Sequence, residues 1–89
     1  MNKIKILYLC NNFDAAQEMT NMMGRKIREI IPKAIQVDLI GRRIETPYAT
    51  IDFISEGNSS INRDKYQMIF SQNDSSIEPF IEAALGEIV

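Results

Sequence analysis

Cys10 is the residue of this chain best suited to covalent chemistry. It is the only cysteine among 89 residues, and it directly follows an apolar run, 4–9, typical of a buried strand. In parallel α/β sheets, reacting groups gather where strands end and helices begin. Backbone N–H groups and the positive end of a helix dipole favour the thiolate form of a cysteine there. Cys10 is therefore the candidate nucleophile.

The residues after Cys10 would have to hold a phosphoryl group carried on its sulfur. Such a loop needs inward-pointing backbone N–H groups, glycine for close approach, and hydroxyl or cationic side chains. This loop has amide side chains but no glycine, serine or threonine, and Asp14 would repel an anion. The residue types therefore favour a buried structural thiol over a working phosphocysteine. The candidate loop residues are Asn11, Asn12, Phe13, Asp14, Ala15, Ala16 and Gln17.

A second polar loop, 71–76, follows the expected strand 66–70. Parallel strands end at the same edge of a sheet, so this loop is expected on the same edge as Cys10. Ser71, Asn73 and Ser75 are its candidate anion donors. N-capping of the following helix is the simpler interpretation of these residues, and the composition favours it.

A long amphipathic helix over 15–31 must position the first loop. Asp14 is the expected N-cap, with Gln17 in capping-box position, and Pro32 ends the helix. Gly24 inside it indicates either a close approach to a sheet or a merely tolerated glycine. The apolar stripe consists of Ala16, Met19, Met23, Ile27 and Ile30.

The remaining chain is predicted to alternate between strands and helices. The run 35–39 alternates as a strand does, and 66–70 is a third strand. Thr46-Pro47 and Gly57 favour a short helix over 47–55, with a strand as the alternative. The last helix carries an apolar stripe of Ile77, Ile81, Ala84, Leu85 and Ile88.

The predicted order is β-α-β-α-β-α, which is typical of an α/β fold. It predicts a three-layer sandwich with a small parallel sheet and right-handed crossovers. Residues 1–89 form a single domain at this length. Three strands would leave both edges exposed, and the last helix shows no C-terminal cap. We therefore expect either partners over the edges or a fragment of a longer chain.

Composition excludes several classes of function. The net charge is −2, so a broad basic face for nucleic acid is not expected, and the basic pairs such as Arg42-Arg43 are interpreted as solvated. One cysteine and no histidine predict neither a disulfide framework nor a metal site, and we expect no cofactor. A reduced thiol favours the cytoplasm. No apolar run is long enough to predict membrane insertion.

The cysteine that closes the first strand, the loop and the long helix resemble enzyme IIB of the sugar phosphotransferase system, of the lactose/cellobiose-like and galactitol-like types. Residues 10–17 align with that family's loop without gaps, but Phe13 replaces its glycine and 15–17 replace its hydroxyl residues. The segment 64–70 is similar to the family's Tyr-Asp-hydrophobic strand. The resemblance implies a bacterial protein whose cysteine accepts a phosphoryl group from enzyme IIA during sugar transport.

Degenerate domains of this family also occur in phosphotransferase-linked transcription regulators, often without the reactive site. A loop without the phosphate cradle favours such a signalling or interaction module. The alternative is an active phosphocarrier that is phosphorylated on Cys10. The implied partners are IIA-like or IIC-like proteins, other domains of a regulator, or a second copy of the chain.

Three other cysteine or phosphate folds are disfavoured. A low-molecular-weight phosphatase needs arginine six residues after its cysteine, and position 16 is Ala16. A receiver domain needs paired acidic residues at the end of its first strand. A thioredoxin-like protein needs a second cysteine.

Overall fold

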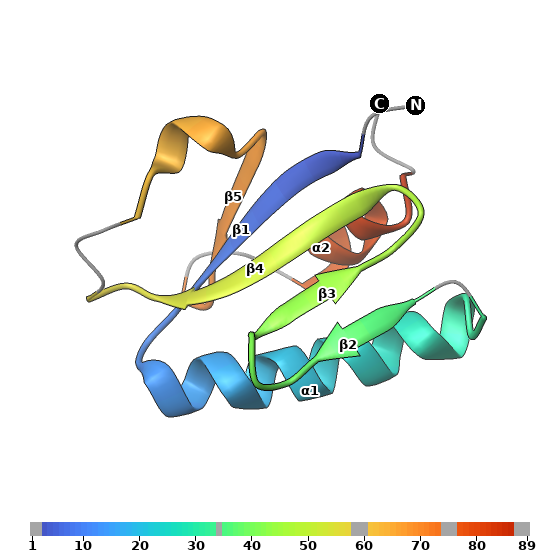
Figure 1. Ribbon diagram of the computed structural model, residues 1–89, viewed down its shortest axis with the longest axis horizontal. Helices are drawn as coiled ribbons and strands as arrows, with labels where there is room; N and C mark the ends of the chain where they lie inside the picture. The colour runs from blue at the N-terminus through green and yellow to red at the C-terminus, as the bar shows by residue number, and fades with distance from the viewer. Residues whose placement is uncertain (1–2, 34, 58–60, 74–76, 87–89) are drawn as a thin grey trace.

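The computed structural model describes residues 3–33, 35–57, 61–73 and 77–86. These residues form five strands, two α-helices and one short 3-10 helix, η1 (Figure 1). In chain order they are β1 (Ile4–Cys10), α1 (Phe13–Ile30), β2 (Gln36–Asp38), β3 (Arg43–Glu45), β4 (Ala49–Ser55), η1 (Arg63–Lys65), β5 (Met68–Ser71) and α2 (Ile77–Ala84).

The sheet has the strand order β2-β3-β4-β1-β5. β1 pairs in parallel with β4 on one side and β5 on the other. The β2–β3 and β3–β4 pairs are antiparallel. The expected α/β class is confirmed, but the sheet is mixed and five-stranded, whereas the sequence predicts a small parallel one.

The helix predicted over 47–55 is wrong, because this segment forms β4 beside the central strand. Ala49, Ile51 and Phe53 alternate with more exposed residues and are buried, which is the period of a strand. Thr46 does not cap a helix. Its Oγ1 accepts from the N–H of Ala49 at 3.0 Å and donates to the carbonyl of Ala84 at 2.8 Å, so it closes the turn between β3 and β4.

Both α-helices pack on one face of the sheet (Figure 1). Ile6, Tyr8 and Cys10 share a core with residues of α1 and α2, whereas Leu7 and Leu9 face the other way, toward Tyr66. The predicted three-layer arrangement is therefore wrong. The predicted β-α-β-α-β-α order is wrong as well, because β2, β3 and β4 follow one another along the chain. Hairpin turns connect β2, β3 and β4, so no helix arises between them to cover the second face.

An aromatic cluster forms the centre of the helix-covered core. The Phe80 ring of α2 lies 5.0 Å from that of Tyr8, 6.0 Å from Phe53 and 5.6 Å from Phe70, measured between centroids. All three contacts are edge-on, the geometry that aromatic quadrupoles favour. This cluster anchors α2 to three strands.

α1 begins two residues earlier than predicted, and Asn12 rather than Asp14 is its N-cap. The Asn12 side chain accepts the N–H of Ala15 at 2.8 Å. Gly24 marks a close approach, because a Cβ there would lie 2.9 Å from Cγ2 of Val37 on β2. The sheet therefore uses this glycine to bring its edge strand onto the helix.

α2 does end with a cap, contrary to expectation. Gly86 has a φ of 75° in the left-handed region, and its N–H donates to Ala83. Of the predicted stripe, Ala84 is buried, and Ile81 and Leu85 pack against the core. Ile88 and the side chain of Ile77 lie outside the described residues. Neither helix of the described segments has the length and apolar character needed to cross a bilayer.

Candidate functional site

Cys10 is the last residue of β1, and its side chain points into the helix-covered core. It is 0% exposed, and its Sγ lies 3.8 Å from the carbonyl oxygen of Tyr8, to which it donates a weak hydrogen bond. Because alternate strand residues share a face, the packing of Ile6 and Tyr8 against the helices buries Cys10 with them.

The environment of Cys10 disfavours the thiolate. Burial raises the pKa of the thiol to about 11, and the negative charge of Glu56 adds to this effect. The expected lowering of this pKa by the start of α1 is therefore wrong. The residue stays a neutral thiol at neutral pH.

The residues after Cys10 form a helix start. Asn12 is used as the N-cap, and 13–17 already belong to α1. Asp14 and Gln17 are exposed on the helix surface, Ala15 is half-buried and Ala16 is buried. The Phe13 ring is 59% exposed and lies 4.1 Å from the guanidinium carbon of Arg42. These residues therefore do not surround the sulfur.

The structure brings the two polar loops together at the carboxyl edge of the sheet. Asn73 Nδ2 donates to Asn11 Oδ1 at 2.7 Å, and the Asn11 N–H donates to the Gln72 side chain at 3.1 Å. Ser71 Oγ donates to Glu56 at 3.1 Å and accepts from the N–H of Asn73 at 3.4 Å. Ser75 lies outside the described residues.

This polar edge is unsuited to hold an anion. Its amide groups already bond to one another, and the N–H of Glu56 donates to the Cys10 carbonyl at 2.9 Å. Among the described residues, the charged side chain in this network is the carboxylate of Glu56, which would repel a phosphoryl group.

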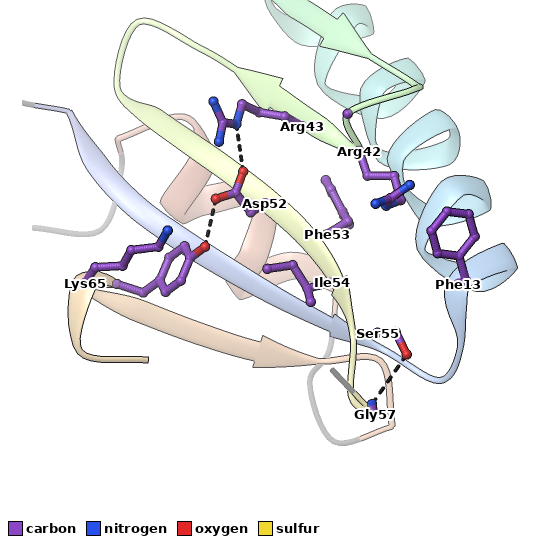
Figure 2. Close-up of a pocket in the computed structure, with 11 residues that line it drawn as sticks. Phe13, Arg42, Arg43, Asp52, Phe53, Ile54, Ser55, Gly57 and Lys65 are labelled. Carbon is purple, nitrogen blue, oxygen red and sulfur yellow. Dashed lines mark hydrogen bonds and ion pairs between the residues drawn. The ribbon is translucent and has the colours of Figure 1, made fainter. Parts of the chain in front are cut away.

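A groove of about 570 Å³ runs along the end of β4, from Phe13 at the start of α1 and the β2–β3 turn to η1 on the face that the helices leave open (Figure 2). Its floor includes Asp52 and Ile54 of β4, and its walls come from the β2–β3 turn and from η1. We call it the basic groove, after the three cationic side chains that line it, Arg42, Arg43 and Lys65.

Asp52 organises the middle of the basic groove (Figure 2). One carboxylate oxygen accepts Arg43 Nε at 2.7 Å, and the other accepts the Tyr66 hydroxyl at 2.8 Å. The hydrogen bond to Asp52 raises the pKa of Arg43. Burial, and then the same carboxylate, raise the pKa of Tyr66. This network fixes the Arg43 guanidinium in its charged form.

The other two cations have no carboxylate partner among the residues that the structure describes. Arg43–Asp52 is the only ion pair among the described residues. The Arg42 guanidinium lies over Phe13, and Lys65 Nζ lies 5.3 Å from the centroid of the Tyr66 ring. Three cations and one carboxylate therefore line the groove.

Sequence reasoning missed this groove, because it treated Arg42 and Arg43 as solvated charges and Asp52 as helical. The alternation across Ile51, Asp52 and Phe53 was a usable signal, since it puts the carboxylate on the side opposite to the core. Nothing local to η1 indicated that Lys65 and Tyr66 would lie beside β4.

Comparisons of the chain with protein-family models, with curated proteins and with solved structures found no match. The resemblance to enzyme IIB therefore stays a prediction from the sequence. In the part of the chain that the structure describes, no three His, Cys, Asp or Glu side chains are grouped so that they could hold a metal ion.

Proposed function

We propose that this domain is a signalling or interaction module that binds a partner, and that Cys10 is a structural thiol. The observation that supports this most strongly is the placement of Cys10. Its side chain is fully buried among core residues, and its pKa is raised to about 11. A phosphoryl acceptor would need the opposite, an accessible thiolate.

The energetics of a phosphocysteine argue in the same direction. A phosphoryl group on Sγ would place roughly two negative charges in an apolar core, where an unpaired charge is strongly unfavourable. Glu56 would add repulsion, and the neighbouring amides are engaged with each other. Transfer from a partner would require the end of β1 to open.

The link to phosphotransferase systems rests on the resemblance of residues 10–17 and 64–70. The module would then belong to a phosphotransferase-linked regulator, with IIA-like or IIC-like proteins or other regulator domains as partners. The competing proposal is an active enzyme IIB phosphocarrier. It would require a second conformation in which Cys10 leaves the core.

Two measurements on the same protein test this proposal. In the first, phosphate label is passed from phosphoenolpyruvate through the general phosphotransferase proteins and a panel of IIA partners to the wild type and Cys10→Ser. We expect no label on either. A label on the wild type alone would contradict the proposal and establish the phosphocarrier.

The second measurement is the rate at which a thiol reagent modifies Cys10 in the native and the denatured protein. We expect native protection of several orders of magnitude, because reaction requires opening of the core. A native rate equal to that of the denatured chain would contradict a structural thiol, whichever IIA partners were used.

A further inference from the structure

We propose that the basic groove is the docking site for an extended acidic segment of a partner protein. This inference rests on the proposed function as an interaction module and names the surface and its ligand. The segment would place acidic side chains at both ends of the groove and an apolar side chain between them.

Charge is the first argument. Three cationic side chains and one carboxylate line the groove, and the carboxylate is already bonded to Arg43. Arg42 and Lys65 have no carboxylate partner among the described residues, so their charges are available to a ligand. Two cations of this kind attract acidic side chains that enter the groove.

The arrangement of the cations favours an extended ligand. Figure 2 shows Arg42 with Phe13 on one side of the groove and Lys65 on the other, with Ile54 between them. Arg43 is already held by Asp52. A compact anion such as one phosphate would contact one free cation, whereas an extended peptide reaches both.

The surroundings of the cations suit a peptide. At each end the cation lies near an aromatic ring, and the exposed ring of Phe13 offers apolar surface to the stem of an acidic side chain. Ile54 is only partly buried and gives the middle of the groove an apolar floor. The volume of about 570 Å³ falls within the usual range of roughly 300–1,000 Å³ for binding pockets.

The backbone of Arg42 supplies a second, independent argument. Its φ of 53° makes it the only described residue other than glycine in the left-handed region. Glycine would fit this hairpin position with less strain. The chain instead places an arginine here, with its guanidinium over Phe13 and donating weakly to the Ile40 carbonyl at 3.4 Å. Strain of this kind is typical of a functional position.

The test is a titration followed by fluorescence anisotropy at low and at physiological salt. The probes are fluorescein-labelled short peptides with two acidic residues on each side of one apolar residue, the apolar residue being varied across a small pool. Matched peptides carry amides in place of the acids. We expect binding of the acidic pool, weakening with salt, and none of the amide pool.

Protein variants locate the binding. Arg42→Glu and Lys65→Glu each exchange an attraction for a repulsion, so we expect each to weaken binding about fivefold or more. The double variant should lose more than either. Arg25→Glu is the matched control, since it makes the same charge change on the exposed surface of α1. It should bind like the wild type.

Arg42→Gly separates binding from folding. It removes the cation at a position where the backbone prefers glycine, so we expect the variant to stay folded but to bind the acidic peptides more weakly than the wild type. Circular dichroism and thermal unfolding check that each variant is folded.

Three outcomes would overturn the proposal. The first is a folded wild type that binds no acidic peptide at low salt. The second is an equal loss in Arg25→Glu, which would show that only net charge matters. The third is displacement of the peptide by inorganic pyrophosphate at equal affinity, which would make the groove a site for compact anions. A label on Cys10 would instead contradict the proposed function, so the two failures are distinguishable.

Discussion

The polar edge beside Cys10 lies at the carboxyl ends of β1 and β5, whereas the basic groove has residues of β4 in its floor, and the two regions differ in how many of their polar groups are bonded to one another. At the edge, Asn11, Gln72 and Asn73 bond to one another, and Glu56 is the charged member. In the groove, Asp52 accepts from Arg43 and from the Tyr66 hydroxyl, and Arg42 and Lys65 have no carboxylate partner within the described segments. A region whose polar groups already bond to one another has few groups left to bind a ligand, whereas the groove has two cations that can bind one.

The two regions also differ by the face of the strand that carries them. Cys10 shares its face with Tyr8 and is sealed beneath the helices, whereas Asp52 lies opposite to Phe53 and faces the open side. Whether a side chain can reach a ligand therefore depends more on the face of the strand that carries it than on its residue type.

The largest expected effect comes from placing a carboxylate on each face. Cys10→Asp buries a charge in the core, so we expect it to cost about 3–5 kcal/mol of unfolding free energy or to abolish folding. Ile69→Asp is the matched variant, because Ile69 is 43% exposed, and it should cost no more than about 1 kcal/mol. Denaturant unfolding measures both. Equal costs would contradict the sealed position of Cys10.

The pH dependence of stability gives the next largest effect. The Cys10 pKa is about 11 in the folded protein and 9.0 as a reference, so above pH 9 the unfolded chain loses this proton first. The free energy of unfolding should fall by about 2–3 kcal/mol as pH rises from about 9 through about 11. Between pH 9 and 10 the stability of Cys10→Ala should fall by about 1 kcal/mol less than that of the wild type, and tyrosine ionisation should contribute equally to both proteins. A wild type that keeps its stability there would refute the raised pKa.

Within the groove, Tyr66→Phe removes the hydroxyl that donates to Asp52. We expect a loss of about 1 kcal/mol in thermal or denaturant unfolding, because Asp52 keeps Arg43 and can gain water. The raised pKa of Tyr66 predicts the sign at high pH. The wild type loses stability above the unfolded value of 10.0, and the variant loses less. A steeper loss in the variant would argue against the hydrogen bond.

The smallest effect on stability is expected for Arg42→Gly. Relief of the left-handed backbone gains about 1 kcal/mol, and loss of the contact with Phe13 costs about 0.5–1 kcal/mol. The net change should therefore stay within about 0.5 kcal/mol of the wild type in denaturant unfolding. A loss above about 2 kcal/mol would show that Arg42 is structural, which would weaken its role in binding.

Sequence patterns predicted the elements that have strong periodicity. The strand ending at Cys10 and the helix ending near Pro32 were found within a few residues, because one is continuously apolar and the other has a clear stripe. β3 was missed, since three residues between two turns carry almost no pattern. In 47–55, three-residue steps from Tyr48 to Ile54 obscured the alternation that the strand uses.

The candidate site was harder to predict, for a physical reason. Residues 6–9 are apolar on both faces, so the sequence does not tell which face the helices cover or where Cys10 points. The groove depends on contacts between residues far apart in the chain, such as Tyr66 with Asp52. Which distant residues come into contact depends on the number of strands in the sheet.

The central position of β1 has a consequence for how the protein is made. Ile6 pairs with Ile51 on one side and with Met68 on the other, so β1 is made before either of its partner strands, β4 and β5. Until then its apolar side chains have no sheet to join, while the β2–β3 hairpin can close locally. β1 is therefore expected to need protection from aggregation during synthesis, and the domain to gain its tertiary structure only after β5 has been made.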